Sequence, residues 1–173
     1  MKQTGFSLVQ LLTGITLIAI VAQFAVPGFA QLIEAQRRDD AARQLASGMR
    51  SARTEAIMRN QVVLIHAIDD DWSLGWRIIV DHNGAGAGDD SNPVLVERAS
   101  SGKIPIVGNA PVKRFVRFNG LGAPLHASGG FLAGTLHVCD AKQSTSDYQV
   151  VLSKTGRVSL RNNKTENKLC RPV

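Results

Sequence analysis

The sequence predicts an α+β fold in which a long N-terminal helix packs on an antiparallel β-sheet. An apolar segment near the N-terminus has the length of a membrane-spanning helix, and an amphipathic segment continues it. The remainder of the 173-residue chain alternates β-branched, apolar segments with short turns rich in Gly and Pro. A helix followed by strands with hairpin-length connections is typical of this fold class, with one globular domain and no internal repeat.

The helix begins in the apolar segment. Residues 3–33 carry no charged side chain, and Leu, Ile, Val, Ala and Phe dominate them. A membrane-spanning helix needs about 20 mostly apolar residues, and the segment from Phe6 to Phe29 meets that length. Backbone polar groups in lipid must be satisfied internally, so the segment is expected to be helical. Pro27 removes one backbone donor and is expected to bend the helix.

The second half of the helix is amphipathic. Apolar residues recur at alternating steps of three and four and form one face, which consists of Ala42, Leu45, Met49, Ala52 and Ala56. Asn60 is a plausible end signal. We therefore expect one helix of about 50 residues, with its first half in lipid and its second half packed on the sheet.

Strands are expected wherever β-branched and aromatic residues gather between turn signals. The expected ranges are 62–68, 72–81, 93–99, 113–118, 131–138, 147–153 and 157–161. A Gly-rich acidic loop lies between the second and third expected strands. Its side-chain oxygens could coordinate calcium, and they belong to Asp81, Asn83, Asp89 and Asp90. The spacing lacks the closing Glu of an EF-hand, so we predict a flexible hairpin loop and no metal site.

Two cysteines, Cys139 and Cys170, are present. Neither has a Cys-x-x-Cys neighbour or a metal-ligand spacing. If the domain lies outside the inner membrane, the compartment is oxidising and the two can pair. We predict a structural disulfide that contributes about 3–4 kcal/mol.

Nothing in the sequence indicates catalysis. The four histidines show no metal-ligand spacing, and no serine lies in a Gly-x-Ser-x-Gly elbow. The protein is therefore predicted not to be an enzyme and to carry no cofactor. Its net charge of +6 favours acidic partners such as lipid headgroups or nucleic acid, without identifying one.

The N-terminus resembles a known processing signal. A five-residue polar leader ends in Gly5 and precedes the apolar run Phe6-Ser7-Leu8-Val9-Gln10-Leu11-Leu12. This resembles the class III signal of type IV pilins and type II secretion pseudopilins; an ordinary membrane anchor is the alternative. The resemblance implies that a prepilin peptidase cuts between Gly5 and Phe6 and methylates Phe6. It divides the chain into a leader (1–5), a transmembrane and filament-core helix (6–30) and a periplasmic globular domain (31–173).

Two internal segments, Ser51–Ala56 and the Trp-x-x-Gly-Trp stretch of Trp72–Asp81, resemble the GspH/FimT group of minor pilins. The resemblance implies a minor type IV pilin that helps to initiate pilus assembly at the inner membrane, with the filament tip as its candidate final position. Its partners would be other major and minor pilins, the prepilin peptidase and the inner-membrane assembly platform. A minor pseudopilin of a type II secretion system is the alternative. The resemblance includes a Pro at position 27, near which pilin helices bend or melt.

Position 10 departs from the pattern of that family. The family usually carries a Glu there, which would pair in lipid with the N-terminal ammonium of a neighbour. Gln10 accepts a hydrogen bond but supplies no counter-charge. The departure fits a rare or tip subunit better than a major pilin.

The C-terminal tail is strongly basic. Residues 154–173 contain one acidic side chain, Glu166, and six cationic ones. The cationic residues are Lys154, Arg157, Arg161, Lys164, Lys168 and Arg171. Some members of the GspH/FimT group bind DNA through a Gly-Arg-x-Arg motif. Here Gly156 and Arg157 match, Ser159 replaces the second Arg, and Arg161 could partly compensate. DNA binding through Arg157, Arg161 and Lys164 is therefore a third candidate, against a basic solvated end tied down by Cys170.

Overall fold

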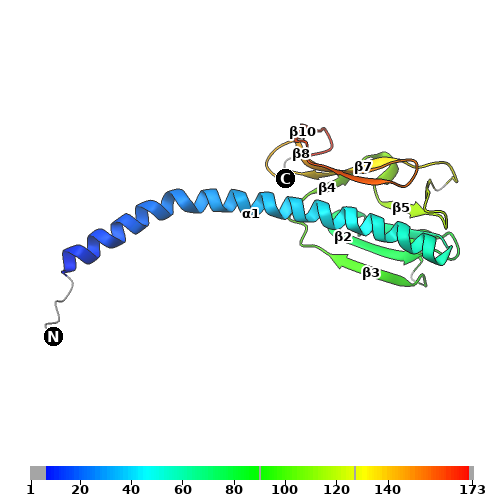
Figure 1. The fold of residues 1–173 in the computed structure, drawn as a ribbon, viewed down its shortest axis with the longest axis horizontal. Coiled ribbons are helices and arrows are strands. Elements are labelled where there is room, and N and C mark those ends of the chain that lie inside the picture. Colours follow the sequence, from blue (N-terminus) through cyan, green and yellow to red (C-terminus); the bar gives the residue numbers. More distant parts are fainter. Residues whose placement is uncertain (1–6, 90, 127, 172–173) are drawn as a thin grey trace. The chain divides into compact units, whose positions relative to one another are not determined.

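The computed structural model describes residues 7–171 apart from 90 and 127, and the side chains of residues 24–27 are not described (Figure 1). The chain divides into two compact units, one up to Arg37 and one from Arg38 onward. A single 52-residue helix, α1 (Leu8–Arg59), contributes to both units. The prediction of one long N-terminal helix is therefore confirmed.

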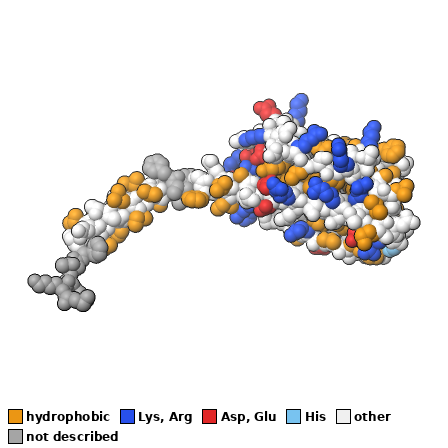
Figure 2. Space-filling model, in the orientation of Figure 1, with side chains coloured by type: hydrophobic (Ala, Val, Ile, Leu, Met, Phe, Trp, Pro, Cys, Tyr) orange, Lys and Arg blue, Asp and Glu red, His pale blue; other side chains and the backbone are white. Residues whose placement is uncertain are grey.

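In the first unit, α1 exposes its apolar side chains. Leu8, Leu17 and Val21 are each more than 60% exposed. Figure 2 shows hydrophobic side chains over the surface of this segment. By length and composition the helix can cross a membrane, and none of its most apolar stretch is buried against the rest of the chain. An apolar helix with no protein partner has the character of a membrane segment.

In the second unit, α1 buries the predicted apolar face. Ala42, Leu45, Met49, Ala52 and Ala56 are all at most 1% exposed and belong to the main hydrophobic core. The remainder of that core comes from the strands, so the helix and the sheets share one apolar interior. This burial supplies most of the stability of the helix in water, because helical propensity alone is weak.

The C-terminus of α1 is closed by its own backbone. Asn60 adopts a left-handed conformation (φ 50°). Its N–H donates to the Ile57 carbonyl at 3.2 Å, and the Gln61 N–H donates to the Ala56 carbonyl at 3.2 Å. This pair of bonds is a Schellman motif, in which Asn is tolerated at the left-handed position. The end signal predicted at Asn60 is therefore confirmed.

The strands form two antiparallel sheets, each paired by backbone hydrogen bonds. The first has the order β3 (Val94–Ala99), β2 (Asp71–Val80), β1 (Val63–Ile68), β5 (Phe115–Phe118) and β6 (Pro124–Leu125). The second has the order β10 (Thr165–Glu166), β8 (Thr145–Leu152), β7 (Gly134–Cys139) and β4 (Ile106–Gly108), and β9 (Val158–Arg161) also pairs with β8. Two short 3₁₀ helices, η1 (Gly86–Gly88) and η2 (Ala110–Val112), lie in the connections.

The seven predicted strands correspond to β1, β2, β3, β5, β7, β8 and β9. Their antiparallel pairing is confirmed, but they are divided between two sheets rather than joined in one. The strands β4, β6 and β10 were not predicted from the sequence. Each of these has only two or three residues, too few for an alternating pattern to be recognised.

The Trp-x-x-Gly-Trp segment fixes β2 to its neighbours. The Trp72 indole N–H donates to the Val112 and Lys113 carbonyls, at 3.1 and 2.9 Å. Trp76 packs on α1 at Gly48, where an added Cβ would lie 2.6 Å from the ring. Gly75 has φ +114°, and an added Cβ would lie 2.1 Å from the Arg98 carbonyl oxygen. Both glycines are therefore needed for close packing around this strand.

Candidate functional site

The start of α1 is closed by Gln10. Ser7 precedes the helix, and its backbone N–H donates to Gln10 Oε1 at 3.1 Å. The Ser7 carbonyl accepts from the Leu11 N–H at 3.1 Å, so the first helical turn begins there. This is half of a capping box, which satisfies a backbone donor that a helix otherwise leaves unpaired. The predicted processing residues Gly5 and Phe6 lie outside the described residues, and Pro27 lies within α1 with its side chain outside them.

A second feature is a groove of about 570 Å³ in the globular domain, which we call the arginine groove. It lies beside the C-terminal part of α1 and the turn between β8 and β9. Its lining residues are Arg50, Arg53, Thr54, Thr155, Gly156, Arg157 and Val158. No acidic side chain is found among these lining residues.

Two of the three guanidinium groups are held by backbone carbonyls. Arg53 Nε donates to the Gly122 carbonyl at 2.9 Å, and Arg50 Nη2 donates to the Val158 carbonyl at 3.3 Å. The Arg157 side chain is exposed and makes no hydrogen bond or ion pair with the part of the chain that the structure describes. The groove therefore combines two cations held by hydrogen bonds with one exposed cation that makes no such bond to the described residues.

Gly156 makes the groove possible. It adopts φ +82°, which favours glycine, in the turn that leads into β9. An added Cβ would lie 2.3 Å from the Gly122 carbonyl oxygen and 2.8 Å from Arg53 Nε. Because only glycine allows this approach, the β8–β9 turn packs directly against Arg53 and brings Arg157 beside the helix.

The other two residues predicted for DNA binding lie outside the groove. Arg161 is exposed at the end of β9, and Lys164 Nζ donates to Gln143 Oε1 at 3.0 Å. The structure thus joins Arg157 to Arg50 and Arg53 rather than to Arg161 and Lys164. The two helical arginines, Arg50 and Arg53, were not among the residues predicted from the sequence. Their spacing of three residues places them on neighbouring positions of one helix side, but nothing local indicates that Arg157 lies opposite.

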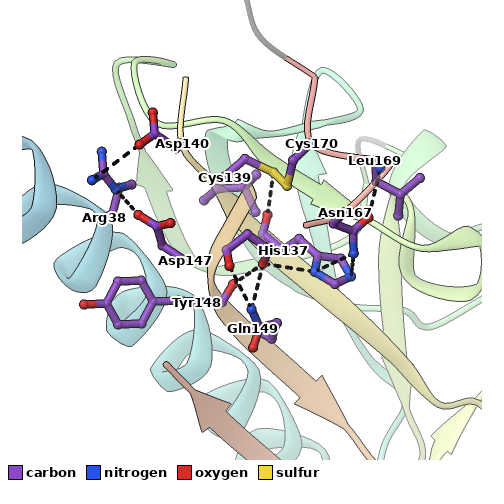
Figure 3. The surroundings of a disulfide bond; sticks show 12 residues. Arg38, His137, Cys139, Asp140, Asp147, Tyr148, Gln149, Asn167, Leu169 and Cys170 are labelled. Atoms are coloured by element: carbon purple, nitrogen blue, oxygen red, sulfur yellow. Dashed lines mark hydrogen bonds and ion pairs between the residues drawn. A yellow bond between two sulfur atoms is a disulfide. The ribbon is translucent and has the colours of Figure 1, made fainter. Parts of the chain in front are cut away.

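The third feature is the disulfide, which the structure contains as predicted, between Cys139 and Cys170 (Figure 3). It joins the end of β7 to the C-terminal tail, and both cysteines are about 1% exposed. Next to it, Arg38 of α1 forms an ion pair with Asp147 (Nε to Oδ2, 2.7 Å) and a longer one with Asp140 (3.8 Å). The side chains in both pairs are 13–16% exposed. The disulfide and these ion pairs therefore connect the C-terminal tail, the second sheet and α1.

A network of polar side chains lies beside the disulfide. His137 Nδ1 lies 3.1 Å from Ser146 Oγ, and Asn167 Nδ2 lies 3.2 Å from His137 Nε2 (Figure 3). Gln149 Nε2 donates to the Asn163 carbonyl at 2.8 Å. Burial lowers the pKa of His137, because a neutral ring is easier to remove from water than a charged one. These contacts fix the tail residues that lead to Cys170.

The acidic loop after β2 is held by its own polar groups. Asp81 Oδ2 pairs with Arg117 Nη2 at 2.8 Å, and Asp81 Oδ1 accepts from the Gly86 N–H at 3.0 Å. The Asn83 amide donates to the Asp89 carboxylate. Asp81 is therefore engaged by protein groups, and Asp90 lies outside the described residues. Within the described residues, no cluster of three or more His, Cys, Asp and Glu side chains could hold a metal.

Comparisons with known proteins give one matching family model and two solved structures that share the fold. A family model described as type II transport protein GspH matches residues 41–156. A search of curated proteins finds no match. Two crystal forms of the type IV minor pilin FimU from Pseudomonas aeruginosa (strain PAO1) share the fold at 21% identity. The P21 form has a TM-score of 0.59 and covers 80% of this chain and 98% of FimU. The P65 form has a TM-score of 0.57 and covers 77% and 99%.

Proposed function

The chain belongs to the GspH family of type II transport proteins, and from this premise we propose that it is a minor type IV pilin. In this role it is a structural subunit that helps to initiate pilus assembly and stands at the pilus tip. The observation that carries the proposal is the division of α1 into an exposed apolar half and a half buried in a globular domain. FimU, which shares the fold, is itself described as a type IV minor pilin.

The proposed mechanism is association of helices, without catalysis. Prepilin peptidase cuts between Gly5 and Phe6 and methylates Phe6, and the helix over residues 6–30 stays in the inner membrane. The globular domain, residues 31–173, lies in the periplasm. An inner-membrane assembly platform then transfers the subunit to other major and minor pilins. Apolar helices held in lipid can exchange lipid contacts for contacts with neighbouring helices, which lets one segment serve both locations.

The contact of Gln10 supports a low-abundance subunit. Its side chain accepts a hydrogen bond from the Ser7 N–H of its own helix and carries no charge. A neutral amide cannot attract the N-terminal ammonium of a neighbour as a carboxylate would. A subunit that docks once, at the start of assembly, needs that attraction less than a subunit added at every step.

A gene deletion tests the proposal. We expect loss of twitching motility and of surface filaments, because assembly is not initiated. The full-length gene should restore both, and N-terminal sequencing of the restored protein should begin at Phe6. A complementing gene with Gly5→Leu, which blocks cleavage, should leave the protein in the membrane and restore neither. Normal filaments in the deletion strain would contradict the proposal.

A minor pseudopilin of a type II secretion system is the second candidate, and the description of the matching family favours it. Under this alternative the same deletion leaves surface filaments intact and traps secreted enzymes in the periplasm. Measuring filaments and secreted enzymes in one deletion strain therefore separates the two candidates.

DNA binding in natural transformation is the third candidate. The exposed Arg157, just before β9, and Arg161, its last residue, favour it, because exposed cations can contact phosphates without reading sequence. A gel shift with the full chain in detergent micelles tests it. Arg157→Ala combined with Arg161→Ala should weaken binding of duplex DNA; unchanged binding would exclude this tail as the site.

A further inference from the structure

The arginine groove gathers positive charge without a counter-charge. Arg50, Arg53 and Arg157 line it together, and none of its described lining residues is acidic. Guanidinium groups stay charged at all physiological pH values, so the three groups cannot relieve their repulsion by losing protons. Glu55, the acidic residue of α1 closest in sequence to Arg50 and Arg53, is already paired with Arg59 at 2.8 Å. The charge in the groove is therefore available to an anion from another molecule.

The helical arginines are positioned before any anion arrives. Arg53 Nε is bonded to the Gly122 carbonyl, and Arg50 Nη2 is bonded to the Val158 carbonyl. Each of these bonds uses one donor of a planar group that carries five N–H donors. The remaining donors are held near one place, which lowers the conformational entropy lost on binding. Planar forks of this kind match carboxylate and phosphate oxygens in pairs.

The lining of the groove favours carboxylates over nucleic acid. No aromatic side chain is found among the lining residues, so unpaired bases would have nothing on which to stack. Duplex DNA is contacted well by long, solvated cations, and such cations lie outside the groove at Arg161 and Lys168. The groove itself offers held guanidinium groups and backbone, which suits discrete carboxylate side chains.

We propose that the arginine groove binds an acidic segment of a neighbouring filament subunit. This inference rests on the proposed function, because it takes other pilins as the molecules that lie alongside the domain. Carboxylates of that segment pair with Arg50 and Arg157, and Arg53 packs against Gly156 in the turn that precedes Arg157. The contact adds a globular-domain interaction, specific in charge, to the association of the apolar helices.

A binding experiment with the full chain in detergent micelles tests the groove. The probe is a hexaglutamate peptide, with a hexaglutamine peptide as the neutral control and a short DNA duplex as the competing polyanion. The groove variant is Arg50→Gln with Arg157→Gln, and the matched control is Arg161→Gln with Lys168→Gln, which removes the same charge outside the groove. Arg53 is left unchanged because it also supports the fold. Thermal unfolding checks that both variants are folded.

We expect hexaglutamate to bind, hexaglutamine not to bind, and the groove variant to weaken hexaglutamate binding by about tenfold or more. The matched control, Arg161→Gln with Lys168→Gln, should change hexaglutamate binding by less than about twofold. Equal losses in the two variants would overturn the proposal in favour of diffuse charge, and no binding to the wild-type chain would overturn it outright. Tight binding of DNA that the groove variant alone abolishes, with no hexaglutamate binding, would make nucleic acid the occupant and also overturn it.

The same variants separate this inference from the proposed function. If hexaglutamate binds the groove but the deletion strain still makes filaments, the groove stands as an acidic-peptide site and the pilin role fails. If the deletion strain loses filaments but the groove variant binds hexaglutamate as the wild type does, the pilin role stands and this inference fails.

Discussion

In the first half of α1, Leu8 and Leu17 are 78% and 64% exposed, whereas in the second half Leu45 and Met49 are at most 1% exposed. Both halves have the same backbone structure, so the difference lies in what surrounds them. The first half is mostly apolar and has no charged side chain as far as Ile33, while the second has one apolar face and many charges off that face. The distribution of charge, rather than the number of apolar residues, therefore separates a helix that enters lipid from one that packs on protein.

The largest expected effect comes from placing one carboxylate in each half. Leu45→Asp removes a buried side chain, which costs about 2–5 kcal/mol, and leaves an unpaired charge in the core, which costs several more. That sum is comparable to the whole stability of a domain, so we expect the domain not to fold. Near-ultraviolet circular dichroism of the full chain in micelles should show loss of the tryptophan signals.

The matched substitution Leu17→Asp should leave the domain intact. A carboxylate near the centre of a membrane helix costs about 2.5–3.5 kcal/mol of insertion free energy. We therefore expect normal tryptophan signals and a smaller membrane-bound fraction after cell fractionation. The comparison between the halves would fail if Leu17→Asp unfolded the domain or if Leu45→Asp unfolded nothing.

A smaller effect is expected from the disulfide, which lies entirely within the domain. Cys139 and Cys170 are 31 residues apart, and closing a loop of that size stabilises the folded state by about 3–4 kcal/mol. Replacing both cysteines with Ala should lower the unfolding free energy of the domain by that amount in urea titrations. Membrane partitioning should not change. Detection of two thiols in the folded wild-type protein would contradict the assignment of the bond.

The smallest expected effect is a dependence of stability on pH. Burial lowers the pKa of both His137 and His66 in the folded domain. Below the ordinary pKa of about 6.5, the unfolded chain binds protons on these rings more readily than the folded chain does. The unfolding free energy should therefore be highest above that pH and should fall as the solution becomes more acidic.

His137→Asn sharpens this prediction. The variant lacks one of the two partly buried rings, so its unfolding free energy should fall less steeply between about pH 7 and pH 5. His126→Asn, which changes an exposed ring, is the control and should keep the wild-type slope. Equal slopes in the wild type and His137→Asn would show that this ring does not contribute.

Much of the fold was predictable because its signals are local. The apolar residues from Ala42 to Ala56 recur with the helical period, and Asn60 marks the end of the helix in its own backbone conformation. The long strands carry β-branched residues in sequence, and two cysteines allow only one intramolecular pair. The division into two sheets was not predictable, because the pairing of strands depends on contacts between segments distant in sequence.

The candidate site divides in the same way. An uncharged apolar helix before the domain, two available thiols at Cys139 and Cys170, and a basic tail can all be read from the order of residues. The position of Arg157 beside Arg50 and Arg53 depends on the folded arrangement of the chain. Arg50 contacts Val158 across 108 residues of sequence, and Gly156 allows the close approach. A charge in the sequence specifies no neighbour, since its surroundings exist only once distant segments have packed together.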